Sequence, residues 1–106
     1  MDVEFLVVTY DSEQVIDACL ASVRCWAPSA TITVVDNASQ DNTVRIAQRL
    51  ADRLLVLDQN YGYAGALNRV VERDGPEFLV VINPDLVLET DINPLLTALR
   101  PDGHDA

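Results

Sequence analysis

Short apolar runs alternate along this chain with stretches in which apolar residues recur every three or four positions. The runs predict strands at four places, namely Phe5–Val8, Thr31–Val35, Arg53–Leu57 and Phe78–Ile82. The periodic stretches between and after them predict helices. Because the strands are almost wholly apolar and short loops join them to the helices, we expect an α/β fold. Its form would be three-layer α/β/α, with a mostly parallel sheet covered on both faces.

Capping residues and helix breakers indicate where the helices begin and end. Asp11 or Ser12 is predicted to cap the first helix, and Pro28 follows its end. A short third helix is expected to turn three side chains inward, Leu67, Val70 and Val71. The pattern occupies residues 1–100 as a single domain, and residues 101–106 are predicted to form a flexible tail.

The charge balance excludes several classes of function. The 106 residues include 17 acidic and 7 basic side chains, for a net charge of -10, and this argues against a nucleic-acid surface. All the basic residues are arginine, so a Walker A loop and Schiff-base catalysis, which both need a lysine, are excluded. The single histidine, His104, argues against a histidine-rich metal site or a Ser-His-Asp triad.

The spacing of the two cysteines indicates in which cellular compartment the protein is found. Cys19 and Cys25 are six positions apart in a predicted helix. An axial rise of about 9 Å puts them beyond disulfide reach. We expect reduced thiols in a cytoplasmic protein. No apolar run approaches the roughly 18 to 20 residues of a membrane span, so no transmembrane segment is expected.

A polar, turn-forming segment follows each predicted strand. These segments are Thr9–Asp11, Asp36–Ser39, Asp58–Asn60 and Asn83–Asp85. Right-handed crossovers place the carboxyl ends of parallel strands at one edge, where ligands of open α/β sheets bind. Each segment taken alone is more typical of an ordinary turn or helix cap. Together they predict one site.

Two of these segments suggest how a phosphate-bearing ligand would bind. Asp85 could hold Mg²⁺ or Mn²⁺ against a diphosphate, although Asn83-Pro84-Asp85 also suits a simple turn. The glycines of Asn60-x-Gly62-x-x-Gly65 would let the backbone approach a ligand closely, or would merely form a tight turn. This spacing is not a dinucleotide fingerprint, which has three glycines after the first strand of its unit.

In their order along the chain, these motifs resemble those of family 2 glycosyltransferases with the GT-A fold. The residues that carry the resemblance are Val7–Tyr10, Val34–Ser39 with Asp41, Asn60–Asn68 and Ile82–Asp85. The Asn-Pro-Asp version is similar to the rhamnosyltransferase-like branch. The resemblance extends from Val3 to about Leu99, which is the N-terminal, nucleotide-sugar-binding half of such enzymes.

The resemblance implies a partner, a cofactor and a set of site residues. A nucleoside-diphosphate sugar would be bound by Thr9, Tyr10, Asp36, Asn37, Asn60, Gly62, Ala64, Gly65 and Asn68. Thr9, Tyr10 and Asp36 would line the nucleobase and ribose pocket, and residues 60–65 would close over the nucleotide. Asp85 matches the family's metal-binding aspartate. Because Asn83 replaces the first acidic position, a Mg²⁺ or Mn²⁺ ion would depend more on the donor's diphosphate.

The resemblance also implies what the intact enzyme does and how the sheet is ordered. The activity would be transfer of the sugar to an acceptor hydroxyl with inversion, but no residue here matches the family's catalytic base. The expected strand order, 3-2-1-4, leaves the uncharged strand Phe78–Ile82 at an edge, which predicts a homodimer through that strand.

Two other functions fit the same pattern. A non-catalytic interaction module with the GT-A-like fold would lack the acceptor half and the catalytic base, and would use the exposed edge to bind a partner. A phosphoacceptor receiver domain fits the size, the acidity and the βα alternation. The missing lysine, and the lack of paired acidic residues after the first strand, argue against the receiver domain.

Overall fold

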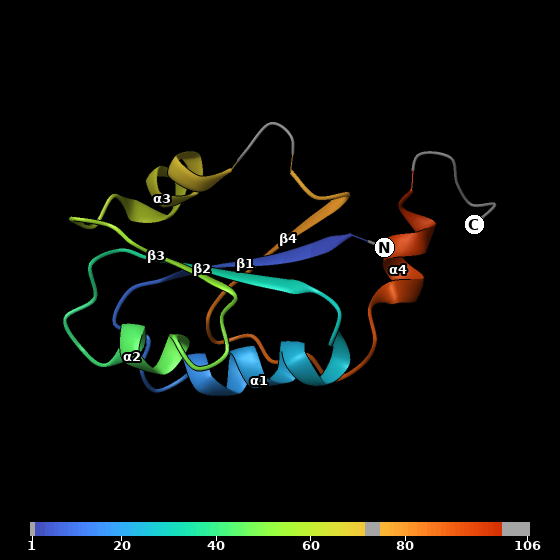
Figure 1. Ribbon diagram of the computed structural model, residues 1–106, viewed down its shortest axis with the longest axis horizontal. Coiled ribbons are helices and arrows are strands. Elements are labelled where there is room, and N and C mark those ends of the chain that lie inside the picture. Colours follow the sequence, from blue (N-terminus) through green and yellow to red (C-terminus); the bar gives the residue numbers. More distant parts are fainter. Residues whose placement is uncertain (1, 72–74, 101–106) are drawn as a thin grey trace.

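The computed structural model describes residues 2–71 and 75–100, and within them strands alternate with helices (Figure 1). The elements are β1 (Val3–Thr9), α1 (Ile16–Trp26), β2 (Thr31–Asp36), α2 (Thr43–Ala47), β3 (Arg53–Val56), α3 (Gly62–Val70), β4 (Phe78–Ile82) and α4 (Asn93–Ala98). Each predicted strand is present, within two residues of its expected ends. The predicted tail, residues 101–106, lies outside the described residues.

The four strands form one parallel sheet in the order β3-β2-β1-β4. In the centre of the sheet, Val7 pairs with Val34 on one side and with Ile82 on the other. The predicted α/β fold, its parallel sheet and its strand order are therefore confirmed. All four strands point their carboxyl ends toward the same end of the sheet, which we call the rim.

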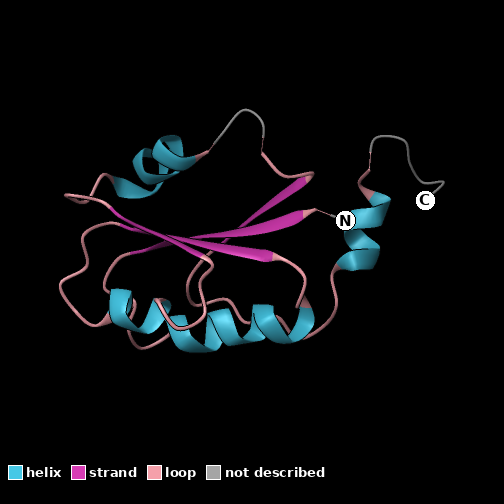
Figure 2. Cartoon of the chain, viewed as in Figure 1, coloured by secondary structure: helices cyan, strands magenta, loops and turns pink. Residues whose placement is uncertain are grey.

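The larger part of the core lies on the side of the sheet that α1 and α2 cover (Figure 2). Alternate residues of each strand face this side. They meet α1 through Ile16, Cys19, Leu20 and Val23, none of which is exposed. Burying a side chain of this kind contributes about 1.5 to 3 kcal/mol, so this layer holds most of the apolar stabilisation.

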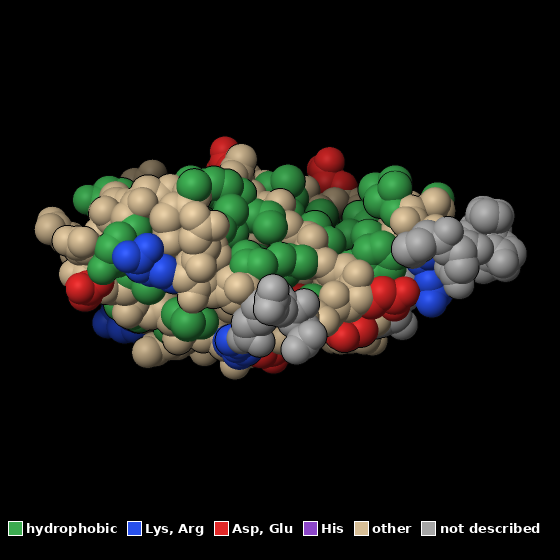
Figure 3. Space-filling model, turned by 90° about the horizontal axis from the view of Figure 1, so that it is seen from above, with side chains coloured by type: hydrophobic (Ala, Val, Ile, Leu, Met, Phe, Trp, Pro, Cys, Tyr) green, Lys and Arg blue, Asp and Glu red, His purple; other side chains and the backbone are tan. Residues whose placement is uncertain are grey.

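The opposite side of the sheet is only partly covered. There α3 packs on a small cluster formed by Leu6, Val8, Val35 and Ala66. On β4, Leu79 and Val81 remain 38% and 36% exposed, and hydrophobic side chains gather on this face in Figure 3. The prediction that helices cover both faces of the sheet is therefore correct for the α1 side, whereas the opposite face is covered only in part. Val71, predicted to point inward, is 53% exposed because α3 ends at Val70.

Arg24 in α1 joins three segments at the end of the sheet opposite the rim. Its guanidinium donates hydrogen bonds to the carbonyl oxygens of Ala30 and Leu50 and to the Asp52 carboxylate at 2.5 Å. The same carboxylate accepts the backbone N–H of Ile32 at 2.7 Å. The hydrogen bond from Arg24, with that from Ile32, lowers the pKa of Asp52 below its ordinary value.

The predicted cap of α1 was wrong. The helix is preceded by Val15, without a side-chain cap, and the carbonyl of Ser12 accepts the N–H groups of Val15 and Ile16. The side chains of Asp11 and Ser12 make other contacts: the Asp11 carboxylate accepts the N–H of Gln40, and the Ser12 hydroxyl bonds to the Tyr10 backbone. Asp11 and Ser12 are of residue types that often cap helices, but here their side chains bond to the loop after β2 and to Tyr10 instead.

Two further observations concern the cysteines and the helices. Cys19 is buried and Cys25 is exposed, and both are free thiols. Among residues 2–71 and 75–100, no helix is both long enough and apolar enough to cross a membrane.

Candidate functional site at the rim of the sheet

The loops that follow β1 and β2 are joined by reciprocal hydrogen bonds. The N–H of Asp11 donates to the Ser39 hydroxyl at 2.7 Å, and the N–H of Gln40 donates to the Asp11 carboxylate at 2.8 Å. Asp11 and Ala38 adopt left-handed backbone conformations, with φ of 46° and 61°. Such conformations are uncommon for residues other than glycine, and here the contacts between the loops hold them in place.

A second set of contacts extends this junction toward α2. The Glu13 carboxylate accepts the N–H of Asn42, and the Asp41 carboxylate accepts the N–H of Glu13. Asp41 also accepts the hydroxyl and the N–H of Thr43. Desolvation acts to raise the pKa of Asp41, but the hydrogen bonds from Thr43, Glu13 and its own backbone outweigh it and lower the pKa. The carboxylates at this junction thus act as acceptors for backbone N–H groups.

Asp36, the last residue of β2, lies beneath this junction with no exposed surface. One carboxylate oxygen accepts the hydroxyls of Thr9 and Ser39, each at 2.6 Å. The other oxygen accepts the N–H of Ser39 at 2.7 Å. A buried carboxylate is tolerated only when it is hydrogen-bonded in this way. Asp36 therefore holds the ends of β1 and β2 and the start of the following loop together.

The three residues that were expected to line a nucleobase and ribose pocket differ in their exposure to solvent. Thr9 and Asp36 are fully buried and bond to each other, whereas Tyr10 is 48% exposed on the rim. Tyr10 can reach a ligand directly. Thr9 and Asp36 support the backbone around it, and direct contact between them and a nucleotide stays a prediction.

Asn37 connects this junction to the segment that precedes α3. Its backbone N–H donates to the carbonyl of Thr9 at 2.9 Å. Its side-chain oxygen accepts the N–H of Tyr61 at 3.0 Å, and its side-chain nitrogen donates to the carbonyl of Gly62 at 3.2 Å. The residue is only 3% exposed. A single side chain thus joins two loops of the rim, which lie about 24 residues apart in the chain.

The glycines of the predicted loop are required where α3 begins. Gly62 has φ of +77°, a conformation that side chains disfavour, and its N–H donates to the Asn60 side chain at 2.8 Å. A Cβ atom at Gly65 would lie 2.8 Å from the Cβ of Tyr61. One glycine therefore serves the backbone conformation, and the other leaves room for Tyr61.

Tyr61 is held by contacts that the sequence did not reveal. The guanidinium of Arg69 lies 3.4 Å from the centre of the Tyr61 ring, and the Tyr61 hydroxyl donates to Asp58 at 2.5 Å. Sequence alone suggests only that Arg69 lies on a solvated face of the helix. The signal that could have found it is the spacing of Tyr61, Gly65 and Arg69 at intervals of four, which places them along one side of a helix. Ala64 and Asn68 lie exposed on α3.

Asp85 lies exposed in the turn that follows β4. The carbonyl of Asn83 accepts the N–H of Leu86 at 3.0 Å to form the turn, and the Cys19 thiol contacts the same carbonyl at 3.8 Å. Burial, together with the nearby Asp85 charge, raises the pKa of Cys19 to about 11. Within the described residues, Asp85 makes no hydrogen bond or ion pair, and no group of three His, Cys, Asp or Glu side chains could hold a metal ion alone.

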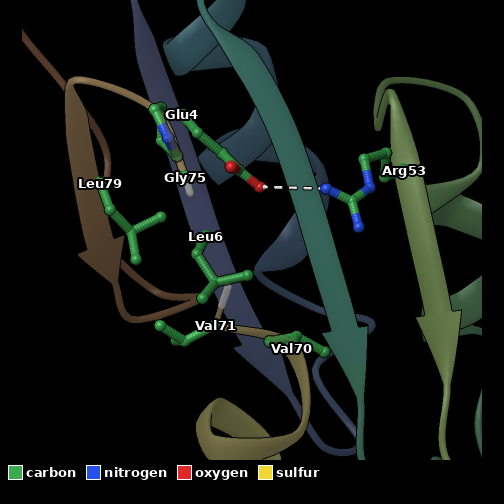
Figure 4. Close-up of a pocket in the computed structure, with 8 residues that line it drawn as sticks. Glu4, Leu6, Arg53, Val70, Val71, Gly75 and Leu79 are labelled. Atoms are coloured by element: carbon green, nitrogen blue, oxygen red, sulfur yellow. Dashed lines mark ion pairs between the residues drawn. The ribbon is translucent and has the colours of Figure 1, made fainter. Parts of the chain in front are cut away.

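Two small cavities lie away from the rim. One, of about 40 Å³, lies on the α3 side of the sheet, where Arg53 reaches over β2 toward Glu4 (Figure 4), with 3.9 Å between their charged groups. The other, of about 150 Å³, lies between the start of β1 and α4. Neither contains a predicted site residue, so the candidate site is the surface of the rim itself.

The chain is similar in sequence and in structure to known proteins. The sequence model of "Glycosyl transferase family 2" matches residues 4–106. A poly-β-1,6-N-acetyl-D-glucosamine synthase of Staphylococcus epidermidis is 26% identical over 94 residues, which cover 84% of this chain and 23% of that protein. The chain thus spans about a quarter of the length of this relative.

Solved structures show the same fold. A mannosyltransferase from Pyrobaculum calidifontis, in complex with GDP-Man and Mn²⁺, superposes with a TM-score of 0.81 at 24% identity, over 93% of this chain and 32% of that one. Staphylococcus aureus TarS in complex with UDP gives a TM-score of 0.72 at 24% identity, over 92% of this chain and 31% of that one. The order of the strands, the joined loops at the rim and the match over residues 4–106 lead to one conclusion: this chain belongs to glycosyl transferase family 2.

Proposed function

We propose that the rim binds the nucleoside-diphosphate part of a sugar donor, and that the intact enzyme transfers the sugar with inversion to an acceptor hydroxyl. The observation that carries this proposal is the hydrogen-bonded junction of the loops after β1, β2 and β3, which forms one continuous surface. The comparison proteins in complex with GDP-Man and with UDP support it.

Some residues of the rim would contact the nucleotide, and others would hold these residues in place. Tyr10 is exposed beside the junction, where its ring could stack on a nucleobase. The segment 60–65 carries a backbone bend at Gly62 and begins α3, so it can close over the nucleotide. Thr9, Asp36 and Asn37 would hold these groups in place from below.

A divalent cation would complete the site. Asp85 fits this role because its carboxylate is exposed and has no hydrogen bond or ion pair within the described residues. Since a single carboxylate is a weak ligand set, oxygens of the donor diphosphate and water would supply the other ligands of Mg²⁺ or Mn²⁺. When bound, the cation would neutralise the departing diphosphate. The comparison structure with GDP-Man and Mn²⁺ supports this choice of cofactor.

Calorimetric titration tests the proposal directly. UDP, dTDP and GDP are titrated into the chain with and without Mn²⁺, and we expect heat with at least one of them that increases when Mn²⁺ is present. A preference for dTDP would support the rhamnosyltransferase-like branch, which the Asn83-Pro84-Asp85 turn suggests. Absence of binding for every nucleotide, with the fold intact by circular dichroism, would contradict the proposed function.

Asp85→Ala tests the metal ligand. We expect the Mn²⁺-dependent part of nucleotide binding to weaken by about 1 to 3 kcal/mol, the range for losing a charged partner, while the fold is kept. Asp17→Ala is the matched control, because Asp17 is an exposed aspartate in the first turn of α1. If Mn²⁺-assisted affinity were the same in Asp85→Ala and wild type, Asp85 would not be the ligand.

A second function, protein interaction through β4, is favoured by a specific observation. β4 forms one edge of the sheet, it contains no charged residue, and Leu79 and Val81 are exposed on one face. Such an edge can pair with another strand. We propose a homodimer through β4, which Val81→Lys should convert to a monomer in sedimentation equilibrium. A monomeric wild type at high concentration would contradict it.

The free thiols of Cys19 and Cys25 support a cytoplasmic location for this protein.

A further inference from the structure

We propose that Asn37 is a positioning residue: its side chain sets the place of the segment 60–62, and thereby the shape of the donor site, without contacting the nucleotide. The inference rests on the proposed function, because it assigns a role within the same site. It differs from the role expected of Asn37 as a residue that binds the nucleotide.

The first argument is that both ends of the Asn37 amide are already engaged. The oxygen accepts the N–H of Tyr61 and the nitrogen donates to the carbonyl of Gly62. With 3% of its surface exposed, the residue presents almost nothing to a ligand. Asn37 itself is immobilised, since its backbone N–H extends the β1–β2 ladder to Thr9.

The second argument is that few other contacts hold the start of α3. The helix has a single buried residue, Ala66, and packs on a small apolar cluster. Its first residue, Gly62, has little packed against it, since no heavy atom outside its chain neighbours and the backbone of α3 lies within 4 Å of where a Cβ would stand. An apolar cluster fixes distance but not rotation or register, so the directional hydrogen bonds of Asn37 decide where this segment lies.

The third argument is that Tyr61 transmits the position further along α3. Its backbone N–H is bonded to Asn37, its ring lies against Arg69, and its Cβ fills the space that Gly65 leaves open. A shift of the Tyr61 backbone would therefore move both the turn and the helix face behind it. Asn37 controls this shift because it bonds on both sides of the Tyr61–Gly62 peptide.

The test combines nucleotide affinity with amide hydrogen exchange of the nucleotide-free protein, for wild type, Asn37→Ala and Asn37→Asp. We expect Asn37→Ala to bind the nucleotide about tenfold more weakly and to lose exchange protection at the Tyr61 amide, while amides in β1 keep theirs. Asn37→Asp keeps an acceptor for Tyr61 but not the donor to Gly62. It should therefore retain protection at Tyr61 and lose less affinity. Asn93→Ala, which removes an exposed asparagine side chain at the start of α4, away from the rim, is the matched control.

The outcomes separate this inference from the proposed function. If wild type binds no nucleotide but Asn37→Ala exposes the Tyr61 amide selectively, the proposed function fails and the positioning role stands. If Asn37→Ala weakens binding while the Tyr61 amide stays protected, the side chain contacts the nucleotide and the inference is overturned. The inference would also be overturned if Asn37→Ala lost exchange protection uniformly along the chain and the Tyr61 amide of Asn37→Asp exchanged freely as well.

Discussion

Replacement of Asp36 by asparagine should destabilise the whole domain, although Asp36 was expected to bind a nucleotide. The carboxylate accepts three hydrogen bonds, from the hydroxyls of Thr9 and Ser39 and from the N–H of Ser39, and donates none. An asparagine has the same shape but carries an N–H₂ group in place of one oxygen. Its oxygen has to face the N–H of Ser39, which cannot turn away, so the N–H₂ group faces the hydroxyls of Thr9 and Ser39.

The magnitude follows from this geometry. The hydroxyls of Thr9 and Ser39 must then rotate to accept from the N–H₂ group, and they lose their charged acceptor. Loss of a charge-assisted hydrogen bond costs about 1.5 to 3 kcal/mol, and the site is fully buried, so water cannot replace it. We expect Asp36→Asn to lower the free energy of unfolding by about 2 to 3 kcal/mol, which corresponds to a decrease in Tm of roughly 10 °C for a domain of this size.

Urea denaturation followed by circular dichroism measures this change. Asp17→Asn is the control, because Asp17 is exposed in the first turn of α1, and its effect should be within about 0.5 kcal/mol. Thr9→Val, which removes one donor to Asp36, should cost about 1 kcal/mol, and the double variant should lose less than the sum of the two changes. If Asp36→Asn unfolded at the wild-type urea concentration but bound nucleotide poorly, Asp36 would be a ligand-binding residue and the supporting role would be refuted.

Three further predictions follow from other contacts. Gly65→Ala should destabilise the domain by about 1 to 3 kcal/mol and weaken nucleotide binding, because the added methyl would meet Tyr61 at 2.8 Å; unchanged stability in urea would contradict this. The lowered pKa of Asp52 stabilises the fold above the unfolded pKa of about 3.9, and this contribution is lost as the pH falls through the folded pKa. The stability difference between wild type and Asp52→Asn should therefore stay below about 1 kcal/mol at pH 7, because the pair is partly exposed, and should vanish near pH 2. A thiol reagent at pH 8 should modify Cys25 rapidly and Cys19 only on unfolding, because Cys19 is buried and its pKa is raised to about 11, as mass spectrometry of the labelled protein would show.

Local pattern determined much of the architecture. The run Phe78–Ile82 matches β4 residue for residue, since a short apolar segment between helical stretches has few alternatives. The place where the candidate site was sought also came from the sequence, because parallel strands with helical crossovers bring their carboxyl ends together. A tight turn was one of two interpretations of the glycines in Asn60-x-Gly62-x-x-Gly65, and of these Gly62 has a positive φ.

What each polar residue does at the rim was decided by tertiary structure alone. Asp36, Asn37 and Tyr10 are all polar residues at strand ends, yet Asp36 is fully buried, Asn37 joins two loops and Tyr10 is exposed. The partial cover over β4 was equally hidden, because strand pattern reports that a face is apolar but not how far a helix extends across it. The physical reason is the same for both. A residue's periodicity and turn preference depend on its neighbours in the chain, whereas its exposure and several of its hydrogen bonds also depend on segments about 25 or more positions away that only the folded sheet brings together.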